Sequence, residues 1–129
     1  MLDTTVLIDA ERGGNHLAEA IEDNDDVAVA AITVAELRVG VQLAKGARRK
    51  KRGQFVSAVL DALTIEPYDL QVAEAHAALL AHVRGTGTPR GAHDLIIAAT
   101  ARARDRQVVS LDHSGFAKLP EVSLADLLD

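Results

Sequence analysis

The sequence predicts an α/β fold, a sandwich in which helices cover both faces of a mainly parallel sheet. Short β-branched apolar runs, such as DVAVAAIT at residues 26–33, alternate with longer segments whose apolar residues recur at helical spacing. Strands separated by helices pair in parallel, and the connecting helices pack on the sheet. No internal repeat or linker divides the sequence, so we expect a single domain over residues 1–129.

The first half of the chain is predicted to alternate in this way. The run at residues 26–33 leads into a helix, TVAELRVGVQLA, in which Thr33 caps the first turn and Glu36 follows at capping-box spacing. A further helix is expected to begin within the basic run KGARRKKRG and to continue through FVSAVLDAL. Two more helical pieces are expected at residues 6–11 and 16–23. Only two residues precede Asp3, where the first strand should end, so we expect either that strand pairing extends into TTV or that the chain begins a few residues short of its natural start.

The second half continues the alternation. A short strand, TIEPY, precedes a helix over residues 69–85 that has Asp69 as its cap and a terminal glycine, Gly85. After the loop GTGTPRG comes an apolar helix, GAHDLIIAATARA, at residues 91–103. The strand QVVSLD and a short strand or edge element in EVSLADLLD complete the predicted order.

The composition excludes several classes of protein and site. Hydrophobic residues make up 48% of the chain and aromatic residues only 2%, so the core must be aliphatic. Without cysteine there is no disulfide, thiolate zinc site or cysteine nucleophile. No apolar stretch approaches the roughly 20 residues of a membrane span, and acids interrupt the N-terminal apolar run, unlike in a signal peptide. We therefore expect a soluble, cytoplasmic protein that does not associate with membranes.

Four acids occupy similar places in the predicted order. Asp3 ends the first strand, Glu36 lies in the first turn of a helix, Asp94 opens the apolar helix, and Asp112 ends the strand QVVSLD. One such acid is most simply a helix cap. Four of them meet at one edge of a parallel sheet, where they repel one another unless a cation lies between them. Such oxygens suit Mg²⁺ or Mn²⁺, which can activate water for attack on a phosphodiester.

The charge distribution leaves two interpretations of the basic run open. A net charge of −5 argues against nucleic acid as a partner, yet residues 45–53 concentrate cations with no acid among them. The run is either a solvated helix face or loop, or a patch that binds phosphates. Its candidate phosphate-binding residues, which would contact RNA if the chain is a ribonuclease, are Lys45, Arg48, Arg49, Lys50, Lys51 and Arg52.

Four segments together resemble a known family. LDTTVLID, TVAELRVG, HDLIIAATA, and VVSLDHSGF followed by LPEV resemble the PIN-domain ribonucleases, and more narrowly the VapC-type toxins of bacterial type II toxin–antitoxin systems. The resemblance covers essentially the whole chain in the family's order and spacing. It implies the three-layer α/β/α PIN fold and Mg²⁺-dependent endonucleolytic cleavage of RNA, with Mn²⁺ as a substitute. The products would carry a 3′-hydroxyl and a 5′-phosphate, and cleavage would inhibit translation and growth.

The resemblance also implies roles for the acids. Asp3 and Asp94 would be the principal metal ligands, and Glu36 would hold metal-bound water or a second metal. Asp112 matches the fourth acid, so the four together form the implied catalytic and metal site.

Two hydroxyl residues and one departure accompany these acids. Thr4 and Ser110 lie where a hydroxyl can hydrogen-bond a carboxylate or water. Many relatives carry a further acid just before the phenylalanine, whereas here Gly115 precedes Phe116. This difference weakens any expectation of a second metal that needs a fifth carboxylate.

Family members usually form homodimers and bind a small antitoxin of the VapB type. The resemblance therefore implies a homodimer and a toxin–antitoxin hetero-oligomer, in which the antitoxin can place a basic side chain among the acids. An arginine or lysine there would replace the charge of the metal.

Three other functions share parts of this pattern of residues. A non-catalytic PIN-like module that binds RNA or protein would be marked by loss of acids, and all four are present. A receiver-like phosphoacceptor domain needs an early acidic pair and a late lysine, but Lys118 follows the wrong element. A flap-nuclease-like DNase is disfavoured because the chain is small and has no helical-arch segment. His93 and His113 adjoin two of the acids; they are either incidental, or a neutral histidine there could shuttle a proton or contact RNA.

Overall fold

The computed structural model describes residues 1–15 and 26–125. The helix predicted at residues 16–23 and the last part of EVSLADLLD lie outside the described residues. The elements, in chain order, are α1 (Thr4–Glu11), β1 (Ala28–Ala30), α3 (Ala31–Leu43), α4 (Gly46–Ala62), β2 (Thr64–Glu66), α5 (Leu70–Thr86), α6 (Ala92–Ala103) and a 3-10 turn, η1 (His113–Gly115).

The sheet is parallel, as predicted, but its strands are short. β1 pairs with β2 in parallel, with Ala28 opposite Thr64. Isolated parallel bridges extend the pairing on the other side of β1, joining Leu2 to Val29, Leu2 to Val109, and Val108 to Leu124. The predicted strand QVVSLD and the described part of the strand or edge element in EVSLADLLD thus pair only through isolated bridges at Val108, Val109 and Leu124.

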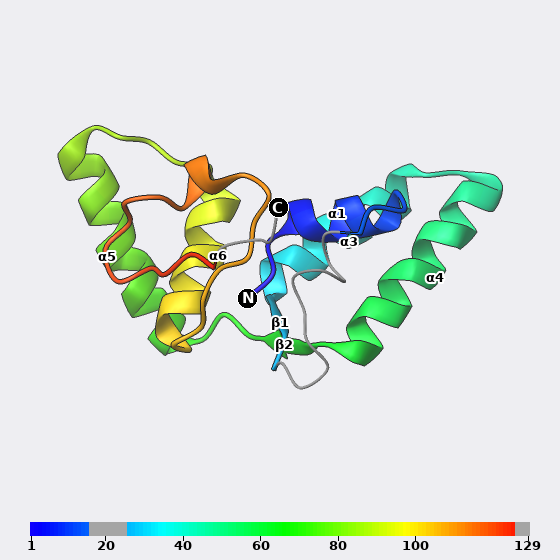
Figure 1. Ribbon diagram of the computed structural model, residues 1–129, viewed down its shortest axis with the longest axis horizontal. Helices are drawn as coiled ribbons and strands as arrows, with labels where there is room; N and C mark the ends of the chain where they lie inside the picture. Colours follow the sequence, from blue (N-terminus) through cyan, green and yellow to red (C-terminus); the bar gives the residue numbers. More distant parts are fainter. Residues whose placement is uncertain (16–25, 126–129) are drawn as a thin grey trace.

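Helices cover both faces of this sheet. In Figure 1, α5 and α6 lie on one side of β1 and β2, and α1, α3 and α4 lie on the other. Each side has its own aliphatic core: Leu79 and Ile97 belong to the cluster that includes α5 and α6, whereas Leu7, Leu37 and Val56 belong to the other. The prediction of a three-layer α/β/α sandwich is therefore confirmed.

The start of α3 differs from the prediction. The run that was predicted to be a strand through residue 33 pairs only as far as Ala30, and the helix begins at the next residue. Ala30 occupies the N-cap position without a side-chain bond, so the predicted Thr33 cap is wrong. Thr33 is buried inside the helix, and Glu36 lies in the second turn instead of the first. Packing against the sheet outweighs the strand propensity of the β-branched residues.

The boundaries of α1 and α5 can also be compared with the prediction. α1 begins at Thr4 with Asp3 as its N-cap, so strand pairing does not extend into TTV. Asp69 caps α5 as predicted, its Oδ1 accepting a hydrogen bond from the backbone N–H of Val72 at 3.1 Å. α5 ends at Gly87 instead of Gly85, because Gly87 adopts the left-handed conformation (φ 66°) that stops a helix. Within residues 1–15 and 26–125, no helix is both long and apolar enough to cross a membrane.

Candidate active site

Asp3 is buried at the start of α1, where three donors hold its carboxylate. It is only 3% exposed. Oδ1 accepts hydrogen bonds from the backbone N–H of Thr5, at 3.0 Å, and from the Thr5 hydroxyl. Oδ2 accepts a hydrogen bond from the Ser110 hydroxyl at 2.7 Å. A buried carboxylate needs such donors, and together they fix the orientation of Asp3.

The two threonines after Asp3 face different partners. Thr5, which we did not single out from the sequence, binds Asp3 and also accepts a hydrogen bond from the backbone N–H of Leu111 at 3.1 Å. The hydroxyl of Thr4 donates to Glu36 Oε1 at 3.0 Å. The signal for Thr5 was its position two residues after a helix-capping aspartate, where a side chain can close back on the cap.

Ser110 connects two of the acids. Its side chain is fully buried, and its oxygen also accepts a hydrogen bond from the backbone N–H of Asp112 at 3.0 Å. The hydroxyl therefore ties the segment that carries Asp112 to the carboxylate of Asp3, although Ser110 and Asp3 are 107 positions apart.

Glu36 reaches the site from α3 and is half-buried. Thr4 holds its Oε1, and its Oε2 lies 3.4 Å from Nδ1 of His93 on α6. Glu36 thus lies between α1 and α6, close to the first turn of the helix that carries Asp94.

Asp94 projects from the first turn of α6 against Gly115. A Cβ atom at position 115 would lie 2.5 Å from Asp94 Oδ2 and 3.0 Å from its Cγ, so the missing side chain makes room for this carboxylate. Burial raises the pKa of Asp94, and the charges of Asp3, Glu36 and Asp112 raise it further. The charge of His93 acts in the opposite direction. The charges of three acids from separate parts of the chain therefore reach Asp94, while a metal site formed by all four stays a prediction.

Asp112 lies at the exposed rim of this cluster. It caps η1, and its Oδ1 accepts hydrogen bonds from the Ser114 backbone N–H at 3.1 Å and from the Ser114 hydroxyl at 2.6 Å. These bonds lower the pKa of Asp112. Its charge reaches Asp94, but one of its oxygens is occupied by Ser114.

The donor set suits a hard divalent cation that keeps much of its water. Among the described residues, no three histidine or acidic side chains are arranged to hold a metal ion by themselves. Mg²⁺ commonly binds proteins through one or two carboxylates and fills its other positions with water. The buried Asp3 and the partly buried Asp94 meet that requirement, because a cation would offset both the burial of the Asp94 carboxylate and the repulsion from its neighbours, which together raise its pKa.

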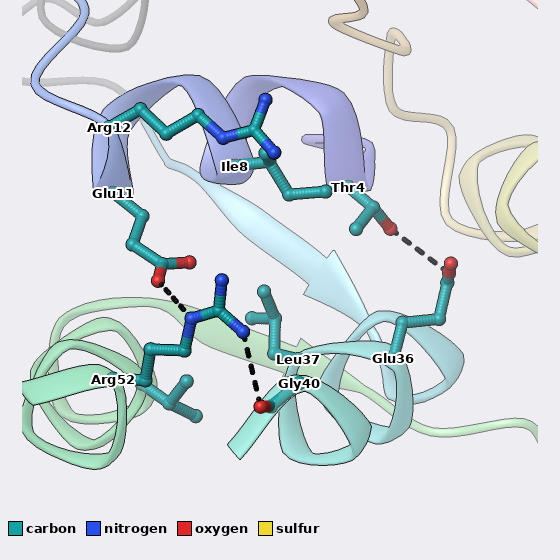
Figure 2. A pocket seen from close by; sticks show the side chains of 9 residues that line it. Thr4, Ile8, Glu11, Arg12, Glu36, Leu37, Gly40 and Arg52 are labelled. Carbon is teal, nitrogen blue, oxygen red and sulfur yellow. Dashed lines mark hydrogen bonds and ion pairs between the residues drawn. The ribbon is translucent and has the colours of Figure 1, made fainter. Parts of the chain in front are cut away.

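A small cavity extends from the acids between α1 and α3. This inner cavity has a volume of about 130 Å³. Thr4 and Glu36 line one end of it, Glu11 and Arg52 line the other, and the side chain of Arg12 extends back along α1 over Ile8 (Figure 2). Its remaining lining residues are Leu37, Gly40 and Val56.

The basic run forms the N-terminal part of α4, after Lys45 at the N-cap. Five of its six cations, Lys45, Arg48, Arg49, Lys50 and Lys51, are exposed. Arg52 is half-buried: its Nε lies 2.9 Å from Glu11 Oε1, and its Nη1 donates to the backbone oxygen of Gly40 at 3.3 Å (Figure 2). The guanidinium of Arg52 thus joins α4 to α1 and α3, and a role of Arg52 in binding RNA stays a prediction.

Comparison with known proteins places the chain in a family. The sequence matches the PIN domain family over residues 1–122. Ribonuclease VapC5 of Mycobacterium tuberculosis is 36% identical over 129 residues, which cover 99% of this chain and 93% of the relative. Ribonuclease VapC of Rickettsia bellii is 28% identical over 127 residues, covering 96% and 92%. A DNA-bound VapBC structure from Salmonella typhimurium has a TM-score of 0.87 at 27% identity, covering 98% of this chain and 96% of that one. The chain therefore belongs to the PIN-domain family, and its similarity to VapC proteins extends along almost its whole length.

Proposed function

We propose that this protein is a VapC-type endoribonuclease that cleaves RNA phosphodiester bonds with Mg²⁺, or with Mn²⁺ in its place. The observation that carries the proposal is that Asp94 is partly buried and that the charges of three other acids, from separate parts of the chain, add to the effect of burial in raising its pKa. Such mutual repulsion costs stability in the metal-free protein. Three hydroxyl side chains nevertheless hold two of these acids in place, which is the arrangement expected of a cation site.

Asp3 and Asp94 are the proposed metal ligands. The donors on Asp3 fix one carboxylate, and the space at Gly115 accommodates the other. A bound divalent cation supplies Lewis acidity, lowering the pKa of the attacking water and neutralising the charge that builds on the phosphate. Asp112, at the rim, contributes negative charge to the same site.

Glu36 is proposed to orient the attacking water. Thr4 fixes Oε1, which leaves Oε2 on the side of His93 for a hydrogen bond from water. The water oxygen forms a bond to phosphorus, the bond from phosphorus to O3′ breaks, and O3′ leaves with a proton. The products are accordingly a 3′-hydroxyl and a 5′-phosphate.

We propose that a VapB-type antitoxin neutralises this activity. Support comes from the similar Salmonella typhimurium protein, whose structure is a DNA-bound VapBC complex. A basic antitoxin side chain placed among the four acids would supply the charge that the cation otherwise supplies. Unopposed RNA cleavage in the cytoplasm would inhibit translation and growth. We also propose a homodimer and a toxin–antitoxin hetero-oligomer, on the strength of the family resemblance alone.

Incubation of the purified protein with total RNA tests the proposal. We expect cleavage with Mg²⁺ or Mn²⁺ and none with excess EDTA, because the acids alone cannot neutralise the phosphate. The new 5′ ends should be ligated to an RNA adapter without prior kinase treatment, since they carry phosphate. Cleavage that persists in EDTA, or 5′ ends that need a kinase, would contradict metal-assisted attack by water.

The same assay separates the alternatives. A non-catalytic PIN-like module would bind RNA and leave it intact under every metal condition. The PIN-domain match over residues 1–122 argues against a receiver-like phosphoacceptor domain. A DNase would cleave single-stranded DNA of matched sequence at least as fast as RNA.

A further inference from the structure

A second pocket adjoins the inner cavity on the side away from the acids. This outer pocket has a volume of about 280 Å³ and shares Glu11, Arg12 and Arg52 with the inner cavity. The ion pair between Glu11 and Arg52 lies at the boundary between the two spaces. Its other lining residues, all from α4, are Arg48, Lys51 and Phe55.

The outer pocket is strongly positive. Arg12, Arg48 and Lys51 are exposed, and none forms an ion pair within residues 1–15 and 26–125. Two of these cations lie on one face of the N-terminal part of α4, whose first turn contains no acid. Arg48, in the first turn, opposes the helix dipole, and its charge repels that of Lys51 three residues further along the helix. An arrangement that costs stability in a chain of net charge −5 is explained by an anionic ligand.

Phe55 adds an apolar surface to this pocket. It is half-buried, with part of its side chain packed against the core that contains Leu37 and Val56 and part lining the pocket. Proteins commonly bind single-stranded nucleic acid with cations that contact the phosphates and with aromatic rings that stack on the bases. A free inorganic anion would make no use of the ring.

The position of the outer pocket relative to the acids indicates which part of the substrate it would bind. The inner cavity begins at Thr4 and Glu36, beside the acids, and ends at the Glu11–Arg52 pair, where the outer pocket begins. We propose that the outer pocket binds a nucleotide of the substrate RNA on one side of the cleaved bond, with a phosphate on Arg12, Arg48 and Lys51 and a base on Phe55. This subsite rests on the proposed ribonuclease function, and it assigns a role to Arg12, which lies outside the basic run.

The matched variants Lys51→Gln and Lys50→Gln test the proposal. Both residues are exposed lysines on the same helix, but only Lys51 lines the outer pocket. Binding of a fluorescein-labelled single-stranded RNA of about 12 nucleotides is measured by anisotropy in EDTA over a range of salt concentrations. We expect Lys51→Gln to weaken binding and to reduce the slope of log K against log salt by about 0.7, the loss of one phosphate contact. Arg12→Gln should behave alike, whereas Lys50→Gln should leave the slope nearly unchanged.

A third variant tests the base contact separately. Phe55→Leu retains an apolar side chain against the core but removes the ring. We expect it to weaken RNA binding roughly fivefold without changing the salt slope, because stacking involves no counterion release. Thermal unfolding of each variant verifies that its fold is intact, and an unchanged affinity of folded Phe55→Leu would refute the base contact.

Several outcomes would overturn the proposed subsite. Equal effects of Lys50→Gln and Lys51→Gln would mean that the basic run attracts RNA only through its overall charge. Undetectable RNA binding by the unsubstituted protein would also contradict the proposal. If Arg12→Gln and Lys51→Gln spare RNA binding but weaken binding of a polyglutamate peptide, the pocket is a protein-docking surface. Because EDTA prevents cleavage, the subsite can fail while nuclease activity is observed with Mg²⁺, and the reverse result is equally distinguishable.

Discussion

Asp94→Asn is expected to reduce RNA cleavage by more than about 100-fold, since loss of even an outer partner of a metal site commonly costs 10–100-fold. Asparagine has nearly the same shape as aspartate but lacks the negative charge that a divalent cation requires. The fold should survive, because Asp94 lies in the first turn of α6 and is only partly buried. Rates are compared with those of Asp61→Asn, which removes an exposed acid on α4 that lies outside the site. Comparable activity of the two variants would contradict the role of Asp94.

The same variant should have a characteristic effect on stability in the absence of metal. The pKa of Asp94 is raised above its ordinary value of 3.8, so its ionisation is less favourable in the folded protein than in the unfolded chain. The ionised Asp94 carboxylate does not destabilise the protein below pH 3.8. Its destabilising effect grows as the pH rises from that value through the folded-state pKa, and it is complete above the folded-state pKa. In EDTA at neutral pH, Asp94→Asn should therefore be more stable than the unsubstituted protein.

Thermal unfolding in EDTA from about pH 4 to about pH 8 measures this effect. The advantage of Asp94→Asn should shrink as the pH falls toward 4, where the native carboxyl group becomes protonated. A variant that is less stable at neutral pH would show that the neighbours of Asp94 stabilise its charge.

Gly115→Ala is expected to reduce cleavage by about tenfold or more, through displacement of the Asp94 carboxylate. The added methyl group would lie 2.5 Å from Oδ2 and 3.0 Å from Cγ, so the side chain must rotate away from Asp3 and Glu36. Small misplacements of reacting groups are costly to catalysis. Stability should change less than activity, because the displaced carboxylate can turn toward solvent.

Gly85→Ala is the matched control for this prediction. Gly85 lies inside α5, where an added Cβ meets no atom within 4 Å. Its replacement should leave cleavage unchanged and stabilise the helix by about 0.5–1 kcal/mol. Steady-state cleavage rates and thermal unfolding of both variants are compared. Full activity of Gly115→Ala would mean that Asp94 does not need its present position.

The sequence predicted the architecture because it follows from chain order. Parallel strands separated by helices bring their carboxyl ends to one edge, and the charges of Asp3, Glu36 and Asp112 reach Asp94, where they add to the effect of burial in raising its pKa. Helix boundaries were less predictable. The residues AIT after Ala30 have strand propensity, but their packing makes them the first turn of α3.

The finer contacts of the site depend on tertiary packing that residue order does not reveal. Thr5 and Leu111 are 106 positions apart and are joined by a hydrogen bond that closes the site around Asp3. Arg52 belongs to a basic run, yet it points inward because Glu11 and the Gly40 carbonyl provide partners. Gly115 stands where many relatives carry an acid. The sequence does not show why, but in the structure a Cβ atom at this position would lie too close to the Asp94 carboxylate.

Thermal unfolding as a function of Mg²⁺ concentration tests most directly whether the four acids form one cation site. Binding to the folded state alone raises the melting temperature with ligand concentration. The unsubstituted protein should gain stability as Mg²⁺ is added, whereas Asp94→Asn should gain much less. The unsubstituted protein should therefore become the more stable of the two, the reverse of the order expected in EDTA. An equal response of both proteins at every Mg²⁺ concentration would contradict the proposed site.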